Sequence, residues 1–168
     1  CMPLFNGARF ISAAIESVMN QSYTDNELLN IDNTSTDDTV GVVRSAAGRD
    51  RRIRLLVNES NVGMVGNWNR CLVESRGEFI KYLFSDDLLA SPDTLRRMVD
   101  VLEHDASIAL VASARTIIDE QSVVRGSRSF DRSDRVFPGG AVIKRCFEEQ
   151  RNLVGEPSVV LFRKEAAK

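Results

Sequence analysis

The chain has 168 residues, of which 43% are hydrophobic, and its 22 basic and 24 acidic residues give a formal net charge of −2. This length fits one domain with a sizeable core. The near-neutral charge removes the broad positive field that non-specific nucleic-acid binding requires, so we expect no nucleic-acid partner. The sequence does not indicate an oligomeric state.

The cysteines and the hydropathy pattern indicate the cellular compartment of the chain. Cys1, Cys71 and Cys146 form no C-x-x-C pair and are odd in number, so neither a disulfide framework nor a zinc site is indicated. The sequence contains no apolar run of about 18 residues and no basic-then-apolar leader. We therefore expect a cytoplasmic protein without a transmembrane segment, or one that is peripheral at the inner face of the membrane.

Segments with helical and strand periodicity alternate along the chain. Ser35 and Asp38 have the spacing of a capping box, which predicts a helix start at Thr36. Alternation of this kind favours a three-layer α/β/α sandwich with a mostly parallel sheet. In chain order we expect a helix over 8–21, a strand over 27–31, a helix over 36–47, a strand over 53–57, a loop over 58–63, a helix over 65–75, a strand over 78–84, a helix from Ser91-Pro92-Asp93 to about His104, and a strand over 108–113.

Two segments depart from this alternation. The polar stretch 119–135 has no period, which predicts a mobile excursion. Cys1-Met2-Pro3 opens the chain with little apolar sequence before the first loop, so the first strand is expected to be truncated or very short. We interpret residues 1–168 as a single domain, truncated at its C-terminus and at its first strand.

Polar residues follow the predicted strands at the points where those strands end. They are Asn6, then Asp32, Asn33 and Ser35, then Asn61, then Asp86 and Asp87. In open parallel sheets, ligands bind beyond the carboxyl ends of the strands, because loops and helix N-termini converge there. The sequence therefore predicts a polar ligand site at this edge of the sheet.

The adjacent acids Asp86 and Asp87 indicate a divalent cation. Neighbouring carboxylates repel one another unless they are solvated, protonated or neutralised by a cation, and Mg²⁺ or Mn²⁺ prefers oxygen ligands. Such a site needs only one or two carboxylates when substrate phosphates supply the other ligands, which points to a nucleoside diphosphate. The alternative interpretation is a solvated loop before a helix, with Asp32 as a turn former and Ser35 as a helix cap.

Ordered blocks over nearly the whole chain resemble the family 2 glycosyltransferases. They are Pro3-Leu4-Phe5-Asn6-Gly7, Ile15-Glu16-Ser17-Val18-Met19-Asn20-Gln21-Ser22-Tyr23, Ile31-Asp32-Asn33-Thr34-Ser35-Thr36-Asp37, Asn61-Val62-Gly63, Gly77-Glu78-Phe79-Ile80 and Ser85-Asp86-Asp87-Leu88-Leu89. The resemblance implies a glycosyltransferase-A fold, a nucleotide-sugar donor linked to UDP or dTDP, a sugar or lipid-linked acceptor, Mg²⁺ or Mn²⁺, and inversion at the anomeric carbon. It also implies a role in cell-wall or polysaccharide biosynthesis.

The resemblance assigns roles to individual residues. Asp32 and Asn33 match the pair that meets base and ribose, Asp86 matches the metal-binding aspartate, and Asp87 is its helper. The nucleotide-binding candidates are Pro3, Phe5, Asn6, Asp32, Asn33, Ser35, Asn61 and Asp86.

Three features depart from the family pattern. Asn33 stands where many members carry a second aspartate, although its amide could still bind uracil or thymine. Phe84 stands where a full Asp-x-Asp motif has its first acid. The family's general base lies well beyond the Gly155-Glu156-Pro157-Ser158 block, so we expect it beyond Lys168 and expect donor binding with little transfer. Glu156 is the one in-chain substitute, and we favour a loop role for it.

Several further interpretations remain to be tested. Trp68 could stack on a sugar, but its helical position favours core packing. Arg49, Arg51, Arg52 and Arg54 are interpreted as a solvated surface turn. The alternative functions are a non-catalytic nucleotide-sugar-binding domain and, less favoured, a nucleotidyltransferase, whose glycine-rich basic loop is absent after the first predicted strand.

Overall fold

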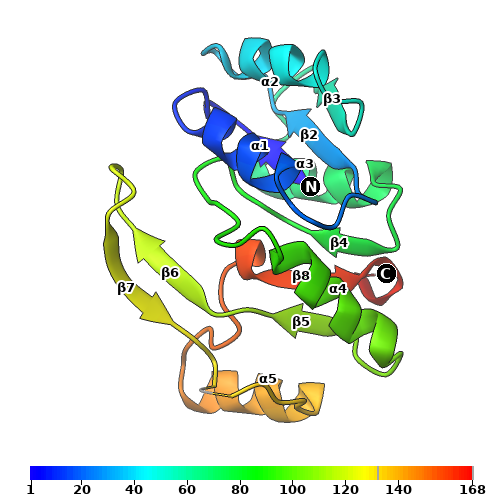
Figure 1. Cartoon of the computed structure of the whole chain (residues 1–168), viewed down its shortest axis with the longest axis vertical. Helices are drawn as coiled ribbons and strands as arrows, with labels where there is room; N and C mark the ends of the chain where they lie inside the picture. The colour runs from blue at the N-terminus through cyan, green and yellow to red at the C-terminus, as the bar shows by residue number, and fades with distance from the viewer. Residues whose placement is uncertain (132, 168) are drawn as a thin grey trace.

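A parallel sheet forms the N-terminal part of the molecule (Figure 1). The computed structural model describes residues 1–131 and 133–167. Strands β1 (Met2–Leu4), β2 (Leu28–Asp32) and β3 (Ile53–Val57) lie in the order β1-β2-β3, and both pairings are parallel. Every residue of β2 is buried, because helices cover both faces of the sheet. The site predicted at the strand ends therefore rests on a buried central strand.

Three helices enclose this sheet as two outer layers. Helices α1 (Ile11–Met19) and α2 (Thr39–Ala47) pack on one face, where they share a core cluster with Leu28. Helix α3 (Gly63–Glu74) packs on the other face, where Leu29 of β2 and Cys71 of α3 belong to a second core cluster. The two leucines are adjacent, and successive strand side chains point to opposite faces. The predicted three-layer α/β class is confirmed.

A second sheet continues from the first. Strands β4 (Phe79–Lys81) and β5 (Leu110–Ala112) both pair antiparallel with β8 (Val160–Arg163), which lies between them. Helix α4 (Thr94–His104) buries its apolar face on this sheet. The sequence analysis did not identify β8 as a separate strand, so it gave no sign of this antiparallel insertion.

Cys1 connects the two sheets through its backbone. Its amino nitrogen donates to the Lys81 carbonyl at 2.7 Å, and its carbonyl accepts the Leu83 N–H at 3.0 Å. These bonds place β4 beside β1. The loop that follows β4 therefore emerges next to the loop that follows β1, which is the arrangement that the predicted site requires.

The segment from 113 to 156 has a different character. Strands β6 (Arg115–Ile118) and β7 (Val124–Arg128) form an antiparallel hairpin, and helix α5 (Gly139–Glu148) follows (Figure 1). The prediction of an excursion without regular structure over 119–135 is wrong for β7, which lies within that range. Polar strands with two solvated faces show no apolar alternation, so the periodicity could not identify them.

The remaining regular elements are short and lie near the end of the described chain. They are the 3₁₀ turns η1 (Pro157–Val159) and η2 (Lys164–Ala167) on either side of β8. Among the described residues, no helix combines the length and the apolar character needed to cross a bilayer.

The predicted capping box does not form. Helix α2 begins at Thr39, and the side chain of Asp38 makes no capping hydrogen bond. The Ser35 hydroxyl instead donates to the Asp32 carboxylate, and the Asp37 carboxylate accepts the Thr39 N–H at 3.0 Å. The spacing of Ser35 and Asp38 was therefore a coincidence, because Ser35 is used by the loop that precedes the helix.

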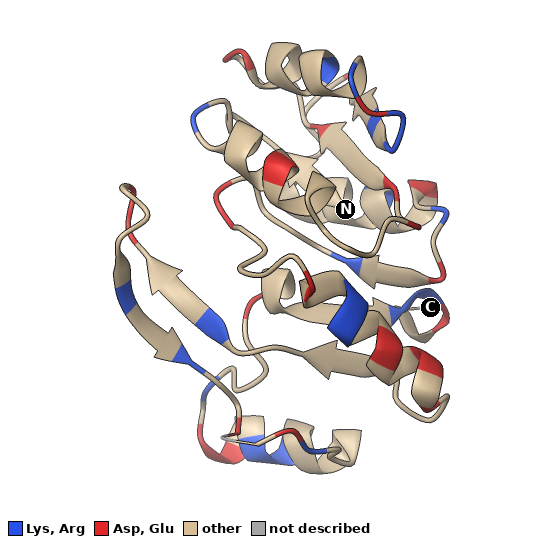
Figure 2. Ribbon diagram, in the orientation of Figure 1, with Lys and Arg blue, Asp and Glu red and all other residues tan. Residues whose placement is uncertain are grey.

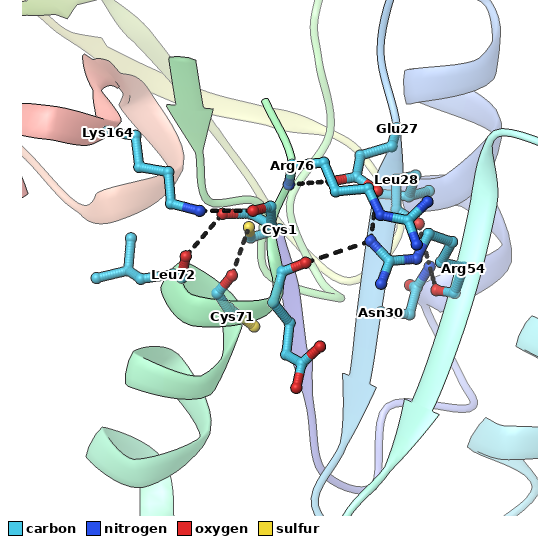
Figure 3. A network of polar contacts seen from close by, with 11 residues as sticks. Cys1, Glu27, Leu28, Asn30, Arg54, Cys71, Leu72, Arg76 and Lys164 are labelled. Atoms are coloured by element: carbon cyan, nitrogen blue, oxygen red, sulfur yellow. Dashed lines mark hydrogen bonds and ion pairs between the residues drawn. The ribbon is translucent and has the colours of Figure 1, made fainter. Parts of the chain in front are cut away.

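Two of the four arginines assigned to a solvated turn are half-buried. Arg52 pairs with Asp50 at 2.7 Å, and Arg54 on β3 pairs with Glu27 at 2.6 Å. Figure 3 shows Arg54 reaching across to Glu27 and to the end of α3, where it also donates to the Glu74 carbonyl. The prediction is wrong for Arg54, which lies on β3, whereas Arg52 does lie in the turn but is half-buried against Asp50 instead of solvated.

Candidate functional site

A cleft opens at the carboxyl ends of the parallel strands. Its volume is about 330 Å³, and it lies where β1 and β2 end, beside the start of α3 and the loop after β4. Its walls are formed by Pro3, Leu4, Phe5, Asn33, Asn61, Met64, Asn67, Trp68, Phe84 and Ser85. Predicted nucleotide-site residues from three separate segments thus share one cavity, as the strand-end argument required.

Asp32 organises the loop after β2. Its side chain is fully buried, and its carboxylate accepts both the backbone N–H of Ser35, at 2.9 Å, and the Ser35 hydroxyl. The Ser35 oxygen in turn accepts the Asn6 N–H at 2.9 Å. A charged acceptor with two donors forms strong hydrogen bonds, so this triad ties the loop after β1 to the loop after β2.

Asn6 supports the same junction from the other side. Its backbone lies in the left-handed region at φ 54°, and its side-chain oxygen accepts the Thr36 N–H at 2.8 Å. The next residue, Gly7, approaches the loop after β4 so closely that an added Cβ would lie 2.7 Å from the Ser85 Oγ. Glycine is needed at position 7 to let these two loops meet.

Asn33 lies in the cleft wall with its amide already engaged. Its oxygen accepts the Val62 N–H at 3.0 Å and the Asn58 amide at 2.7 Å. Its nitrogen donates to the Asn61 oxygen at 2.8 Å and to the Gly63 carbonyl at 3.4 Å. All four hydrogen-bonding positions of this amide are therefore directed at the protein.

Aromatic side chains form another wall of the cleft. Phe84 stacks on Trp68 with ring centroids 5.3 Å apart, and Tyr82 lies behind them at 5.9 Å from Trp68. The core packing predicted for Trp68 is present, but Trp68 also faces the cleft. Phe84, which replaces the first acid of the family motif, thus supplies an apolar surface instead of a charge.

Asp86 and Asp87 differ in their surroundings. Asp86 is exposed, whereas Asp87 is half-buried and hydrogen-bonded to the Ser158 hydroxyl. Burial raises the pKa of Asp87, and the neighbouring charges of Asp86 and Glu156 raise it further, against the opposing effects of the Ser158 hydrogen bond and of Lys81. Negative charge is therefore in excess at this loop.

A divalent cation fits this pair of carboxylates. The described residues hold no group of three or more His, Cys, Asp or Glu side chains placed to bind a metal. Two adjacent carboxylates suffice for Mg²⁺ or Mn²⁺ when phosphates and water complete the coordination. Neither acid is among the residues that line the 330 Å³ cleft, but Ser85, which precedes them, is.

Ser158 is a site residue to which the sequence analysis gave no role. Its hydroxyl oxygen accepts the Phe84 N–H at 3.1 Å, and its carbonyl accepts the Lys81 ammonium at 2.6 Å. Burial lowers the pKa of Lys81 to about 8, partly offset by Asp87. Ser158 therefore holds the acidic loop through hydrogen bonds with Phe84 and Asp87. The position of Ser158 in the Gly155–Ser158 family block was the sequence signal from which this role could have been predicted.

Glu156 lies near the acidic loop but is paired elsewhere. Its carboxylate contacts the Arg115 guanidinium at 2.8 Å, and the Glu156 side chain is 56% exposed. Gly155 before it has φ 110°, and an added Cβ would lie 2.6 Å from the Arg115 guanidinium nitrogen. Arg115 on β6 thus holds the one in-chain candidate for a general base in an ion pair.

A second hollow, of about 540 Å³, runs along α5 and is lined by Val142, Ile143, Cys146, Phe147, Gln150, Arg151, Asn152 and Val154. None of the predicted site residues contributes to it. The larger of the two cavities is therefore not the one supported by the strand-end chemistry.

Comparison with known proteins identifies the family. The model of the family described as "Glycosyl transferase family 2" matches residues 1–168. The chain belongs to the family 2 glycosyltransferases. Membership of this family agrees with the predicted resemblance and favours it over the nucleotidyltransferase alternative.

Curated relatives of this glycosyltransferase chain carry related names. The chain is 34% identical over 128 residues to the putative glycosyltransferase EpsE of Bacillus subtilis, which covers 76% of the chain and 45% of that protein. It is 35% identical over 123 residues to an Escherichia coli UDP-Glc:alpha-D-GlcNAc-diphosphoundecaprenol beta-1,3-glucosyltransferase, which covers 73% of the chain and 47% of that protein. The chain spans less than half the length of these two relatives.

A solved structure shares the fold. The mannosyltransferase PcManGT from Pyrobaculum calidifontis, in complex with GDP-Man and Mn²⁺, superposes with a TM-score of 0.69 at 19% identity. The superposition covers 98% of this chain and 43% of that one. The glycosyltransferase-A fold implied by the sequence is thereby confirmed.

Proposed function

We propose that this glycosyltransferase chain binds a nucleoside-diphosphate sugar in the 330 Å³ cleft, with Mg²⁺ or Mn²⁺ at Asp86 and Asp87, for inverting transfer of the sugar. The observation that carries the proposal is the convergence of three loops on one cavity. The Asp32 triad joins the first two loops, and the contact of Gly7 with Ser85 joins the first to the third. A ligand that spans base, ribose and diphosphate fits such a junction.

The two ends of the cleft suit the two ends of that ligand. Phe5, 54% exposed, and the stacked Trp68 present aromatic surface on which a base can stack. Ser85 and the following acids lie at the loop after β4, where a diphosphate would meet the cation. When bound, the cation neutralises charge that develops on the departing diphosphate.

The names of the compared proteins support a nucleotide-sugar donor of this kind. The Escherichia coli relative is named for a UDP-Glc donor and a diphosphoundecaprenol-linked acceptor, and the Pyrobaculum structure contains GDP-Man with Mn²⁺. We propose a UDP- or dTDP-linked donor and a sugar or lipid-linked acceptor for this chain, as part of cell-wall or polysaccharide synthesis.

The general base of the whole enzyme is proposed to be a carboxylate other than Glu156. An inverting transfer needs a base within hydrogen-bond reach of the acceptor hydroxyl. Glu156 is already neutralised by Arg115 at 2.8 Å, so proton abstraction by it would require that ion pair to break. The ion pair of Glu156 with Arg115 favours a structural role in the loop that precedes Ser158 over a role in proton transfer.

Calorimetric titration with UDP, dTDP and GDP, each with and without Mn²⁺, tests the proposal. At least one of the three should bind with Mn²⁺ present, and Asp86→Ala should weaken binding at least about tenfold through loss of a metal ligand. Asp100→Ala, an exposed change on α4, is the matched control and should bind as the wild type does. Absence of binding by all three nucleotides would refute the proposed site.

A further inference from the structure

Four asparagines form a continuous chain of amide hydrogen bonds behind and along the cleft. The Asn58 nitrogen donates to the oxygens of Asn33 and Asn67, at 2.7 Å and 3.1 Å. The Asn33 nitrogen donates to the Asn61 oxygen at 2.8 Å. The chain connects the end of β2, the loop after β3 and the start of α3, so the four amides orient one another.

Backbone groups fix the direction of three of the four amides in this chain. The N–H of Val62 donates to the Asn33 oxygen, and the N–H of Gly63 donates to the Asn61 oxygen at 2.9 Å. The Asn67 nitrogen donates to the carbonyl of Ile31 at 2.9 Å. A backbone N–H can only donate and a carbonyl can only accept, so the oxygen and nitrogen of these side chains cannot be exchanged.

Asn33 and Asn61, which both line the cleft, differ in the amide atoms that remain available to a ligand. Asn33 is 4% exposed, and both its oxygen and its nitrogen are engaged by the protein. Asn61 is exposed, and its oxygen already accepts two N–H groups. Its nitrogen has no hydrogen-bond partner within residues 1–131 and 133–167. Asn61 therefore offers the cleft a donor and no acceptor.

We propose that Asn61 reads the base of the nucleotide by donating to a ring carbonyl, and that Asn33 is a positioning residue that holds it in that orientation. The assignment rests on the proposed nucleotide function of this cleft. When that carbonyl is the one at C4 of a pyrimidine or C6 of a purine, the donor selects uracil, thymine and guanine over cytosine and adenine, which carry an amino group at the same carbon. A donor that faces an amino group leaves both without a partner.

The other side chains of the wall do not make this distinction. Stacking on Phe5 or Trp68 tolerates every base, because every base has a π-face. The amide of Asn67 is 3% exposed, and its oxygen and nitrogen are bonded to Asn58 and Ile31. Among the amide and aromatic side chains of the wall, base selectivity therefore depends on the donor of Asn61, while Ser85 lies in the loop after β4, at the proposed diphosphate end.

Calorimetry with UDP and CDP in the presence of Mn²⁺ tests the inference, because the two ligands differ only in the base. The wild-type chain should bind UDP at least about tenfold more tightly than CDP. Asn61→Asp keeps the shape and the two accepted N–H groups but replaces the donor by an acceptor. The ratio of the CDP and UDP dissociation constants should then fall to about one or below.

Asn33→Asp tests the positioning role. The new carboxylate places an acceptor against the Asn61 oxygen and the Gly63 carbonyl, so the Asn61 oxygen loses one of its two donors and keeps only the Gly63 N–H. The ratio of the CDP and UDP dissociation constants should then decrease, although residue 33 does not contact the base. Gln121→Glu adds the same charge at an exposed position of the hairpin and should leave the ratio unchanged.

The outcomes separate the inference from the proposed function. If the wild type binds neither UDP nor CDP, the nucleotide function of the cleft fails and the inference fails with it. If both bind equally well, or if Asn61→Asp leaves the ratio unchanged, Asn61 does not read the base, while the nucleotide site stands. Should Asn33→Asp fail to fold by circular dichroism, the Asn61 variant alone decides.

Discussion

The sheet β1-β2-β3 and the segment 113–156 are built in opposite ways. Every residue of β2 is buried, whereas α5 has no buried residue and exposes Ile143 and Phe147 by 59% and 78%. Charged residues of both signs occur along the hairpin and α5 (Figure 2). The 330 Å³ cleft thus stands on a packed core, while the segment beside it is held by local hydrogen bonds and ion pairs.

The contact between the two regions at the tip of the hairpin is weak. Arg9, in the loop before α1, pairs with Glu120 at 2.7 Å, but both side chains are more than 60% exposed. Exposed ion pairs contribute about 0–1 kcal/mol. The stability of the cleft should therefore be largely independent of the hairpin, and four measurements examine that separation.

The largest expected effect is in native-state hydrogen exchange. Amides of β2 should exchange only through global unfolding, which costs about 5 kcal/mol or more in a domain of this kind. Amides of α5 should exchange through local opening with a much smaller free energy. Equal protection of β2 and α5 would show that the two regions unfold together.

A matched pair of isoleucine substitutions sharpens the comparison. Ile31→Ala removes a fully buried side chain of β2 and should lower the free energy of unfolding by about 2–5 kcal/mol. Ile143→Ala on the exposed face of α5 should change it by no more than about 0.5 kcal/mol. Urea denaturation of both variants measures the difference, and similar losses would contradict the account.

The ion pair of Glu27 with Arg54 gives a pH-dependent effect within the packed region. Burial works to raise the pKa of Glu27, but hydrogen bonds from Arg54 and from the Arg76 N–H outweigh it and lower the pKa below its usual value. A lowered carboxyl pKa stabilises the fold above the unfolded pKa of about 4.3, and this contribution is lost as the pH falls through the folded value.

Glu27→Gln should therefore cost about 1–3 kcal/mol at pH 7, since it leaves the half-buried Arg54 without its charge partner. The difference between variant and wild type should shrink below about pH 4. Thermal unfolding of both proteins from pH 3 to pH 7 measures it. A difference that does not change with pH would mean that the pair has no electrostatic role.

The smallest expected effect is at the hairpin tip. Arg9→Ala should change the free energy of unfolding by less than about 1 kcal/mol and should leave nucleotide affinity unchanged. Calorimetry and urea denaturation give the two values. A marked loss of affinity would connect the hairpin to the cleft and break the separation of the two regions.

The same contrast explains what could be predicted from the sequence. Strand β3 was placed at 53–57, as observed, because a short apolar run bounded by polar residues is a strong local signal. Strand β7 has no apolar alternation, so periodicity did not reveal it. Helix α5 does carry apolar residues at helical spacing, with Val142, Ile143, Cys146 and Phe147 on one face, and this available signal was missed. The helix starts at Thr36 and Val65 were displaced by two or three residues, because loop contacts such as that of Ser35 with Asp32 decide where a helix begins.

The sequence predicted which residues gather at the candidate site, but not the hydrogen bonds between them. The gathering of strand-end residues such as Pro3, Phe5 and Asn33 was predictable, because the carboxyl ends of parallel strands meet at one edge. The saturation of the Asn33 amide was not, since all of its partners lie in residues 58–63, which are distant from it along the chain. The contact of Ser158 with the acidic loop could not be predicted either, because Ser158 lies in η1, 72 residues after Asp86 along the chain.

Paramagnetic broadening by Mn²⁺ in the amide spectrum of the protein saturated with UDP tests the central claim most directly. With the ion at Asp86 and Asp87, broadening should be strongest in the loop around residues 84–87 and should extend to the loops after β1 and β2. The Asp86→Ala variant should lose this pattern. Broadening centred on α5, or spread evenly over the surface, would contradict a metal-assisted nucleotide site in this cleft.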